Sequence, residues 1–191
     1  MLPFRTMAQF HPALTPELRE FVVRQQMFFT ASAGATGRVN LSPKGMDTFR
    51  VLADDEVAYL DLTGSGNETA AHLRENGRVT LMFCAFQDKP LILRLYGTGE
   101  AIRPRDPAWP ELIAHFHEFP GQRQIIRVRI ESVQTSCGFA VPLYVFEGHR
   151  DLLTKWAEKK GYDGIRDYWR KKNATSIDGL PTGLLAEERN T

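Results

Sequence analysis

The stretch from Leu62 to Thr69, which reads Leu-Thr-Gly-Ser-Gly-Asn-Glu-Thr, constrains the fold of this chain more than any other. It follows an apolar strand pattern at Val57–Leu62 and opens a helical pattern at Glu68–Glu75. Its two glycines let the backbone turn without a Cβ clash, and Asn67 is a favourable N-cap residue. The free N–H groups and the positive dipole end of a helix start bind anions such as phosphate. The stretch therefore predicts a phosphate site or, as the plainer alternative, a capped turn without a ligand.

Length and charge exclude several classes of protein. The chain has 191 residues, enough for one domain with its own core, and its 24 Lys and Arg against 23 Asp and Glu leave a formal net charge of +1. We expect no nucleic acid as a partner, since nucleic-acid binders carry an excess of positive charge. We expect no membrane partner either, because no apolar run approaches the roughly 20 residues of a membrane span. Residues 1–10 also lack the apolar segment of a signal peptide.

The two cysteines, Cys84 and Cys137, do not make a disulfide framework, and each sits in an apolar strand-like run. We expect both thiols to be buried and reduced, in a cytoplasmic protein. No spacing of His, Cys, Asp or Glu is typical of a metal site, and no Ser-His-Asp or Cys-His arrangement is visible. The sequence thus predicts no metal ligands, and the catalytic residues stay unknown.

Short strand patterns joined by tight turns dominate the chain, with few helical patterns between them. Strands are expected at 28–33, 38–42, 49–52, 57–62, 79–86, 91–102 and 124–133. Helices are expected at 16–26, 68–75, 107–118, 151–160 and 164–172. This order predicts a mainly β fold of the α+β class, an antiparallel barrel with peripheral helices packed outside it.

A dinucleotide-binding fold is the first alternative, because Gly64-Ser65-Gly66 lies between a strand and a helix and Asp88 follows about 20 residues later. Three observations disfavour it. The third glycine of that fingerprint is replaced by Thr69. The strand expected from Leu91 follows its neighbour after a turn too short for a parallel crossover. The rest of the chain has no series of alternating strands and helices.

A second polar constellation runs from Arg38 to Gly45, Arg-Val-Asn-Leu-Ser-Pro-Lys-Gly. With the period of two of a strand, Arg38, Asn40 and Ser42 share one face while Val39 and Leu41 share the other. Arg suits bidentate contact with a phosphate, and Lys44 would add a point charge at the end of the strand. The two cations could meet an anion held by the stretch 62–69, here called the glycine loop. The alternative is a strand whose polar face is simply solvated.

Read together, these segments resemble the pyridoxamine 5′-phosphate oxidase-like family of flavin-binding split-barrel proteins. The resemblance covers about residues 21–103 well and the strand from Gln124 more loosely. It is carried by the order and spacing of residues 38–45, 57–61, 66–67, 76–83 and 93–99.

The resemblance implies a six-stranded antiparallel split barrel of the FMN-binding type, a homodimer, and FMN at the dimer interface. It implies a split-barrel domain with an N-terminal helix at 1–148, and a helical extension packed on the same domain at 149–191. Arg38 matches the strand arginine of the family and Lys44 its phosphate-binding lysine, and Asn67 and Thr69 fall where the family places phosphate-contacting side chains at the helix start. The residues implied to line the ring and ribityl chain of the flavin are Val39, Asn40, Leu41, Ser42, Leu60, Asp61 and Leu62.

Two departures from the family pattern bear on function. Where the oxidase has a Ser-Arg-Lys run, this chain has Asn67-Glu68-Thr69, which loses positive charge and brings in a carboxylate that disfavours an anion. The arginine- and histidine-rich C-terminal signature that holds pyridoxal phosphate in the oxidase is also absent, and residues 137–144 read Cys-Gly-Phe-Ala-Val-Pro-Leu-Tyr instead. The substrate and reaction of that oxidase are therefore not carried over.

The function expected from these patterns is an FMN-binding flavoprotein, an oxidoreductase acting on an unidentified small organic substrate. A flavin carries the hydride chemistry itself, which fits the lack of an obvious catalytic acid or nucleophile. The alternatives are a non-catalytic flavin-binding or sensor protein, and a split barrel that uses deazaflavin or haem. His72 is expected to be a packing or surface residue, and Lys171 and Lys172 are expected on a solvated helix face.

Overall fold

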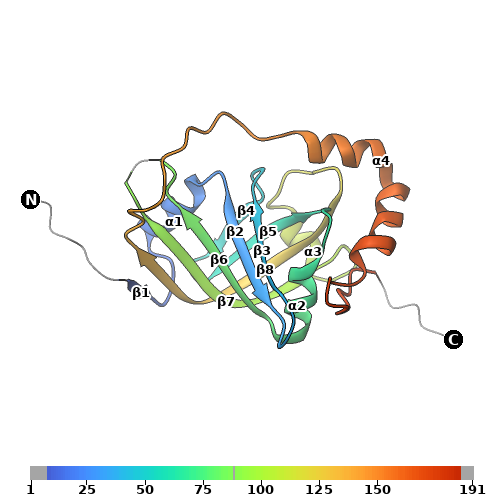
Figure 1. Cartoon of the computed structure of the whole chain (residues 1–191), viewed down its shortest axis with the longest axis horizontal. Helices are drawn as coiled ribbons and strands as arrows, with labels where there is room; N and C mark the ends of the chain where they lie inside the picture. The colour runs from blue at the N-terminus through green and yellow to red at the C-terminus, as the bar shows by residue number, and fades with distance from the viewer. Residues whose placement is uncertain (1–7, 88, 186–191) are drawn as a thin grey trace, which may run out of the picture.

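The structure, a computed structural model, describes residues 8–87 and 89–185. Its centre is one antiparallel sheet of eight strands that curls around a common core (Figure 1). The strand order is β3-β2-β6-β7-β8-β5-β4, and β1 pairs with β8 beside this path. The strands are β1 (Gln9–His11), β2 (Phe28–Ala33), β3 (Val39–Lys44), β4 (Phe49–Ala53), β5 (Glu56–Leu62), β6 (Arg78–Cys84), β7 (Ile92–Ile102) and β8 (Gln122–Ser136).

The helices lie at the periphery of this sheet, as the sequence predicts (Figure 1). They are α1 (Pro16–Arg24), α2 (Glu68–Asn76), α3 (Trp109–Ile113), α4 (Leu152–Tyr168) and the π-helix η1 (Trp169–Asn173). The predicted class, mainly β with peripheral helices in an antiparallel split barrel, is confirmed. The described sheet holds two strands more than the implied six, one of which is the three-residue β1 that the sequence analysis missed.

The hairpin of β2 and β3 forms the edge of the sheet that later contributes to the site. Its register runs from Phe28 opposite Lys44 to Ala33 opposite Val39. Burial alternates along β2, and β3 alternates in the same way with its even-numbered residues inward. The turn between the strands ends at Gly37, whose φ of 88° favours glycine. The period-two prediction is therefore confirmed for Val39 to Ser42, whereas Arg38 precedes the strand and is exposed. The strand also begins and ends slightly later than expected.

Two clusters of apolar side chains fill the barrel and its outer face. The larger cluster includes four aromatic rings, Phe28, Phe49, Tyr59 and Phe83, whose centroids lie 4.9–5.5 Å apart in the contacting pairs. The smaller cluster contains Leu60 and Ile125 and packs against α3. Because β5 contributes to both clusters, its strand is buried on both faces, and the loop after Leu62 leaves from a rigid position.

Three expectations about local structure need correction. The helix predicted at 107–118 is short, because after Ile113 the chain tightens into i→i+3 turns and packs Phe116 and Phe119 against the smaller cluster. The two predicted C-terminal helices are present, separated at Gly161, whose φ of 64° is left-handed, but the second continues from Trp169 as the π-helix η1. Cys84 is buried, but Cys137 is exposed because β8 ends at the preceding residue.

Residues 137–151 leave the end of β8 without regular structure and cross the molecule to α4, the orange segment along the top of Figure 1. The chain then folds back, so that η1 and the residues after it lie near the start of α2. Position 88, which belongs to the rejected dinucleotide fingerprint, lies outside the described residues. No helix in the described ranges is both long enough and apolar enough to cross a membrane.

Candidate functional site

A cleft of about 1070 Å³ lies between β3, the end of β5 and the start of α2. Every residue expected from the sequence to contact a cofactor lines it, eleven in all. These residues are Arg38, Val39, Asn40, Leu41, Ser42, Lys44, Leu60, Asp61, Leu62, Asn67 and Thr69. The fold thus brings together two segments that the sequence analysis linked only by charge and spacing.

The inward face of β3 forms a polar wall of the cleft. Asn40 donates from Nδ2 to Thr69 Oγ1 at 3.1 Å and so links the strand to the first turn of α2. Ser42 Oγ donates to Asn40 Oδ1 at 3.1 Å. The alternate side chains, Val39 and Leu41, are 75% and 62% exposed, so an edge strand of this sheet presents apolar groups to the outside.

A buried charge cluster forms the base of the cleft and is centred on Asp61. Lys44 Nζ donates to Asp61 Oδ1 at 2.8 Å, and Arg123 Nη2 donates to Asp61 Oδ2 at 2.6 Å. Gln124 Nε2 adds a third donor at 2.9 Å. Burial alone would raise the pKa of Asp61, but the two cations and their hydrogen bonds hold that pKa well below its usual range. Two cations against one carboxylate leave a net positive charge here.

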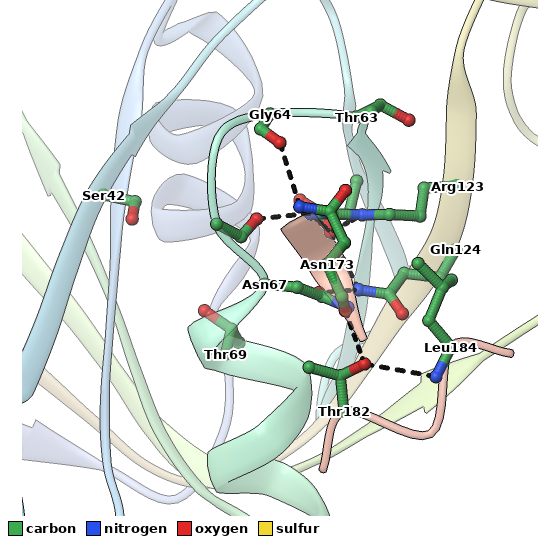
Figure 2. A network of polar contacts seen from close by, with 12 residues as sticks. Ser42, Thr63, Gly64, Asn67, Thr69, Arg123, Gln124, Asn173, Thr182 and Leu184 are labelled. Atoms are coloured by element: carbon green, nitrogen blue, oxygen red, sulfur yellow. Dashed lines mark hydrogen bonds and ion pairs between the residues drawn. The ribbon is translucent and has the colours of Figure 1, made fainter. Parts of the chain in front are cut away.

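The start of α2 is arranged differently from the expected N-cap. Asn67 occupies the N-cap position, yet its side chain makes no cap hydrogen bond. Its Oδ1 accepts from Gln124 Nε2 at 2.7 Å, and its Nδ2 donates to the carbonyl of Asn173 at 3.3 Å (Figure 2). The N–H groups of the first turn therefore have no side-chain cap and keep their capacity to bind an anion.

Arg38 lies at the rim of the cleft. Its side chain is 68% exposed and pairs with Asp178, whose carboxylate also accepts the backbone N–H of Arg38. That backbone hydrogen bond lowers the pKa of Asp178, and the guanidinium of Arg38 lowers it further. Arg38 is thus held by the C-terminal part of the chain, an interaction across 140 residues that no local pattern indicates.

His72, one turn into α2, lies inside the molecule and lines the cleft. Only 1% of its surface is exposed, and its Nδ1 lies 3.0 Å from Ser32 Oγ. Its Nε2 is buried without a hydrogen-bond partner among the described residues. Since buried ring nitrogens are normally paired, this atom fits a site that a polar ligand completes.

Two comparisons of the sequence with known proteins bear on the family of this chain. A sequence model of the pyridoxamine 5′-phosphate oxidase family matches residues 14–137. The chain is also 40% identical over 199 residues to ustO of Aspergillus flavus, a pyridoxamine 5′-phosphate oxidase family protein, with 95% of this chain and 80% of that protein covered. This chain belongs to the pyridoxamine 5′-phosphate oxidase family.

Solved structures share the fold of this family member at low sequence identity. HupZ of Group A Streptococcus superposes with a TM-score of 0.52 at 17% identity, covering 69% of this chain and 99% of HupZ. A candidate pyridoxamine 5′-phosphate oxidase from Lactobacillus delbrueckii superposes with a TM-score of 0.51 at 22% identity, covering 64% of this chain and 94% of the other. At these identities the likeness establishes the split-barrel fold alone.

The family match ends at residue 137, yet the cleft has a further wall made by later residues. Residues that line it from the C-terminal part are Leu153, Lys171, Lys172, Thr175, Ser176 and Ile177. Lys171 and Lys172 are exposed, as expected for a solvated helix face, but both also border the cleft, which the sequence did not indicate. Periodicity could not find this, since it reports the face of a helix and not where the helix packs.

Sequence reasoning also missed Arg123, which is 2% exposed and donates from Nη1 to the carbonyl of Gly66 as well as to Asp61. A charged residue two positions after Gly121 at a strand start was the only signal, and it does not identify a partner 62 residues away. No group of three or more His, Cys, Asp or Glu residues in the described part of the chain is placed to hold a metal ion.

Proposed function

We propose that this member of the family binds FMN in the cleft between β3 and α2 and acts as a cytoplasmic oxidoreductase on a small organic substrate. One observation carries the proposal: the eleven residues that the family resemblance assigns to a flavin line a single cleft. Its volume, about 1070 Å³, slightly exceeds the roughly 300–1,000 Å³ that is usual for small-molecule sites, so the cleft has room for a flavin.

The groups present in the cleft fit a phosphorylated flavin. The uncapped start of α2 and the net positive Lys44–Asp61–Arg123 cluster suit the phosphate. Asn40 and Ser42 offer hydrogen-bonding groups along the wall, and Leu60 and Leu62 offer apolar surface for the chain and ring. The unpartnered Nε2 of His72 is a further polar group for the ligand.

When bound, the flavin supplies the hydride chemistry. The residues of the chain bind, orient and shield it. Asp61 holds Lys44 beside the inner end of β3, and Arg123 fixes the glycine loop through the carbonyl of Gly66. A preorganised cluster of this kind needs no rearrangement on binding, so less binding energy is lost to ordering of side chains.

We further propose a homodimer, with the flavin at its interface. The support is the exposure of apolar side chains on β3 and on the 137–151 segment. Val39 and Leu41 project from the edge strand, and the 137–151 segment exposes Leu143 and Val145 by 76% and 84%. Large apolar side chains exposed to this degree become buried when a second subunit covers them.

The visible absorption spectrum of the purified protein tests the cofactor. We expect flavin bands in the protein as isolated or after addition of FMN, followed by gel filtration to remove free ligand. A colourless protein that takes up no FMN would contradict the proposal. A haem or deazaflavin spectrum would replace FMN with one of the alternative cofactors.

Stopped-flow reduction by NADH or NADPH then separates an enzyme from a non-catalytic flavin-binding or sensor protein. Fast reduction followed by reoxidation by a defined acceptor supports turnover. A flavin that stays oxidised with both donors contradicts the oxidoreductase and leaves the flavin-binding protein.

A further inference from the structure

The positively charged side chains that border the cleft differ in whether a carboxylate pairs with them. Arg38 pairs with Asp178, and both Lys44 and Arg123 pair with Asp61. Lys171 pairs with Asp167 one turn earlier. Lys172 also lines the cleft, and no carboxylate within the described ranges pairs with it. An uncompensated ammonium beside a cleft that suits a phosphate is a candidate ligand for that phosphate.

The position of Lys172 is set by the buried residue that follows it. Asn173 is fully buried, and its Nδ2 donates to the carbonyl of Gly64 at 3.2 Å, as drawn in Figure 2. Its own carbonyl accepts from Asn67 Nδ2 and from Thr182 Oγ1. Four residues earlier, Trp169 Nε1 donates to Thr63 Oγ1 at 2.8 Å. The two ends of η1 are thus fastened to the glycine loop itself.

A π-helical turn at this place is a second sign of function. Turns of this kind are rare overall, and those that occur are frequently found at functional sites. Here η1 spans Trp169–Asn173 and contains Lys171 and Lys172. Asn173, the last residue of η1, is the residue of this turn that is buried.

Glu68 completes the attachment. It was expected to oppose an anion, but its carboxylate accepts the backbone N–H of Ile177, with Oε2 at 3.0 Å and Oε1 at 3.2 Å. A carboxylate in the first turn also interacts favourably with the helix dipole. Glu68 therefore has a structural partner in the same C-terminal segment that carries Lys172.

We propose that the C-terminal extension replaces the positive charge that the loop after β5 has lost. Lys172, assisted by Lys171, contacts the phosphate of the bound ligand, and Asn173 and Glu68 hold the extension against the loop so that it does so. The positively charged residues of the family's Ser-Arg-Lys run would thus be substituted here by lysines more than 100 residues later in the chain. This inference rests on the proposed FMN site and adds residues outside the family match.

Titration of FMN and riboflavin against a set of variants tests the role of Lys172, with quenching of flavin fluorescence as the readout. Riboflavin lacks the phosphate. We expect Lys172→Ala to weaken FMN binding about tenfold, equivalent to about 1.4 kcal/mol, and to leave riboflavin binding within about twofold. Lys172→Arg keeps the charge and should restore most of the affinity for FMN.

Lys159→Ala is the matched control, since Lys159 is an exposed lysine of α4 that does not line the cleft. Glu68→Ala should lower the affinity for FMN despite removing a negative charge, because the extension loses its attachment. If simple repulsion operated instead, Glu68→Ala would raise it. Thermal melting of each variant checks that the fold is intact.

The outcomes separate this inference from the proposed function. If the wild-type protein binds FMN but Lys172→Ala behaves like Lys159→Ala, the role of the extension is wrong and the flavin site stands. Equal losses for FMN and riboflavin would likewise overturn the phosphate contact. If the wild-type protein binds neither flavin, both the inference and the proposed function fall.

Discussion

Replacement of Arg123 by Met tests the buried charge cluster on which the shape of the cleft depends. The guanidinium is 2% exposed, donates to Asp61 through Nε and Nη2, and donates through Nη1 to the carbonyl of Gly66. Removal of one partner of a buried ion pair costs about 3–5 kcal/mol, because the remaining charge stays buried. Since Lys44 still neutralises Asp61, we expect the lower end, about 3 kcal/mol.

For a chain of this size, that loss corresponds to a melting temperature lower by roughly 6–12 °C. Urea unfolding followed by tryptophan fluorescence gives the free energy of unfolding directly. Arg127→Met is the matched control on the same strand, because Arg127 pairs with Glu100 at the surface. That exposed pair should contribute at most about 1 kcal/mol. The double variant Asp61→Leu/Arg123→Met should recover part of the loss, because it removes both fully buried charges and leaves only Lys44, whose side chain is 23% exposed and can be solvated.

If Arg123→Met costs no more than Arg127→Met, the buried cluster does not stabilise the fold and our reading of Asp61 is wrong.

Three further predictions concern the phosphate, the pH dependence and assembly. Lys44→Ala should weaken FMN binding roughly ten- to a hundredfold, from about 1.5–3 kcal/mol for a charge-assisted contact, with little change for riboflavin; equal losses for both flavins would contradict the phosphate contact. The folded-state pKa of Asp61 is depressed, so its contribution to stability is present above its unfolded pKa of about 3.9 and is lost as the pH falls towards the folded value. Urea unfolding at pH 7 and pH 3 should therefore give a smaller difference for Asp61→Asn than for the wild-type protein, and an equal difference would rule out this contribution. We expect a dimer whose interface buries more than about 2,000 Å² in total. Light scattering should detect this dimer at micromolar concentration, and a stable monomer would count against it.

The parts of this structure that the sequence predicted are those controlled by local patterns. The alternation at residues 39–44 determines which side chains face inward, and burial along β3 follows it. The apolar run before Leu62 and the polar start at Glu68 similarly mark the end of β5 and the beginning of α2. Each of these signals depends on neighbours within a few residues and is read directly from the chain.

The parts that sequence reasoning missed depend on contacts between distant segments. Asn67 has the residue type of an N-cap, but its side chain binds Gln124 and Asn173, which become neighbours only in the folded state. Glu68 looks unfavourable for an anion until the N–H of Ile177 is seen beside it. Lys172 likewise resembles any solvated lysine in the sequence, because the contact of Asn173 with Gly64 that places it at the cleft joins distant segments. Composition and periodicity carry no information about such pairs.

A crystal structure of the protein grown with FMN would show directly whether the flavin occupies the cleft. We expect density for the flavin in the cleft between β3 and α2, with its phosphate within hydrogen-bonding distance of Lys44 Nζ and of backbone N–H groups at the start of α2. Density for FMN elsewhere on the protein, or a phosphate turned away from both groups, would contradict the assignment of this cleft as the flavin site.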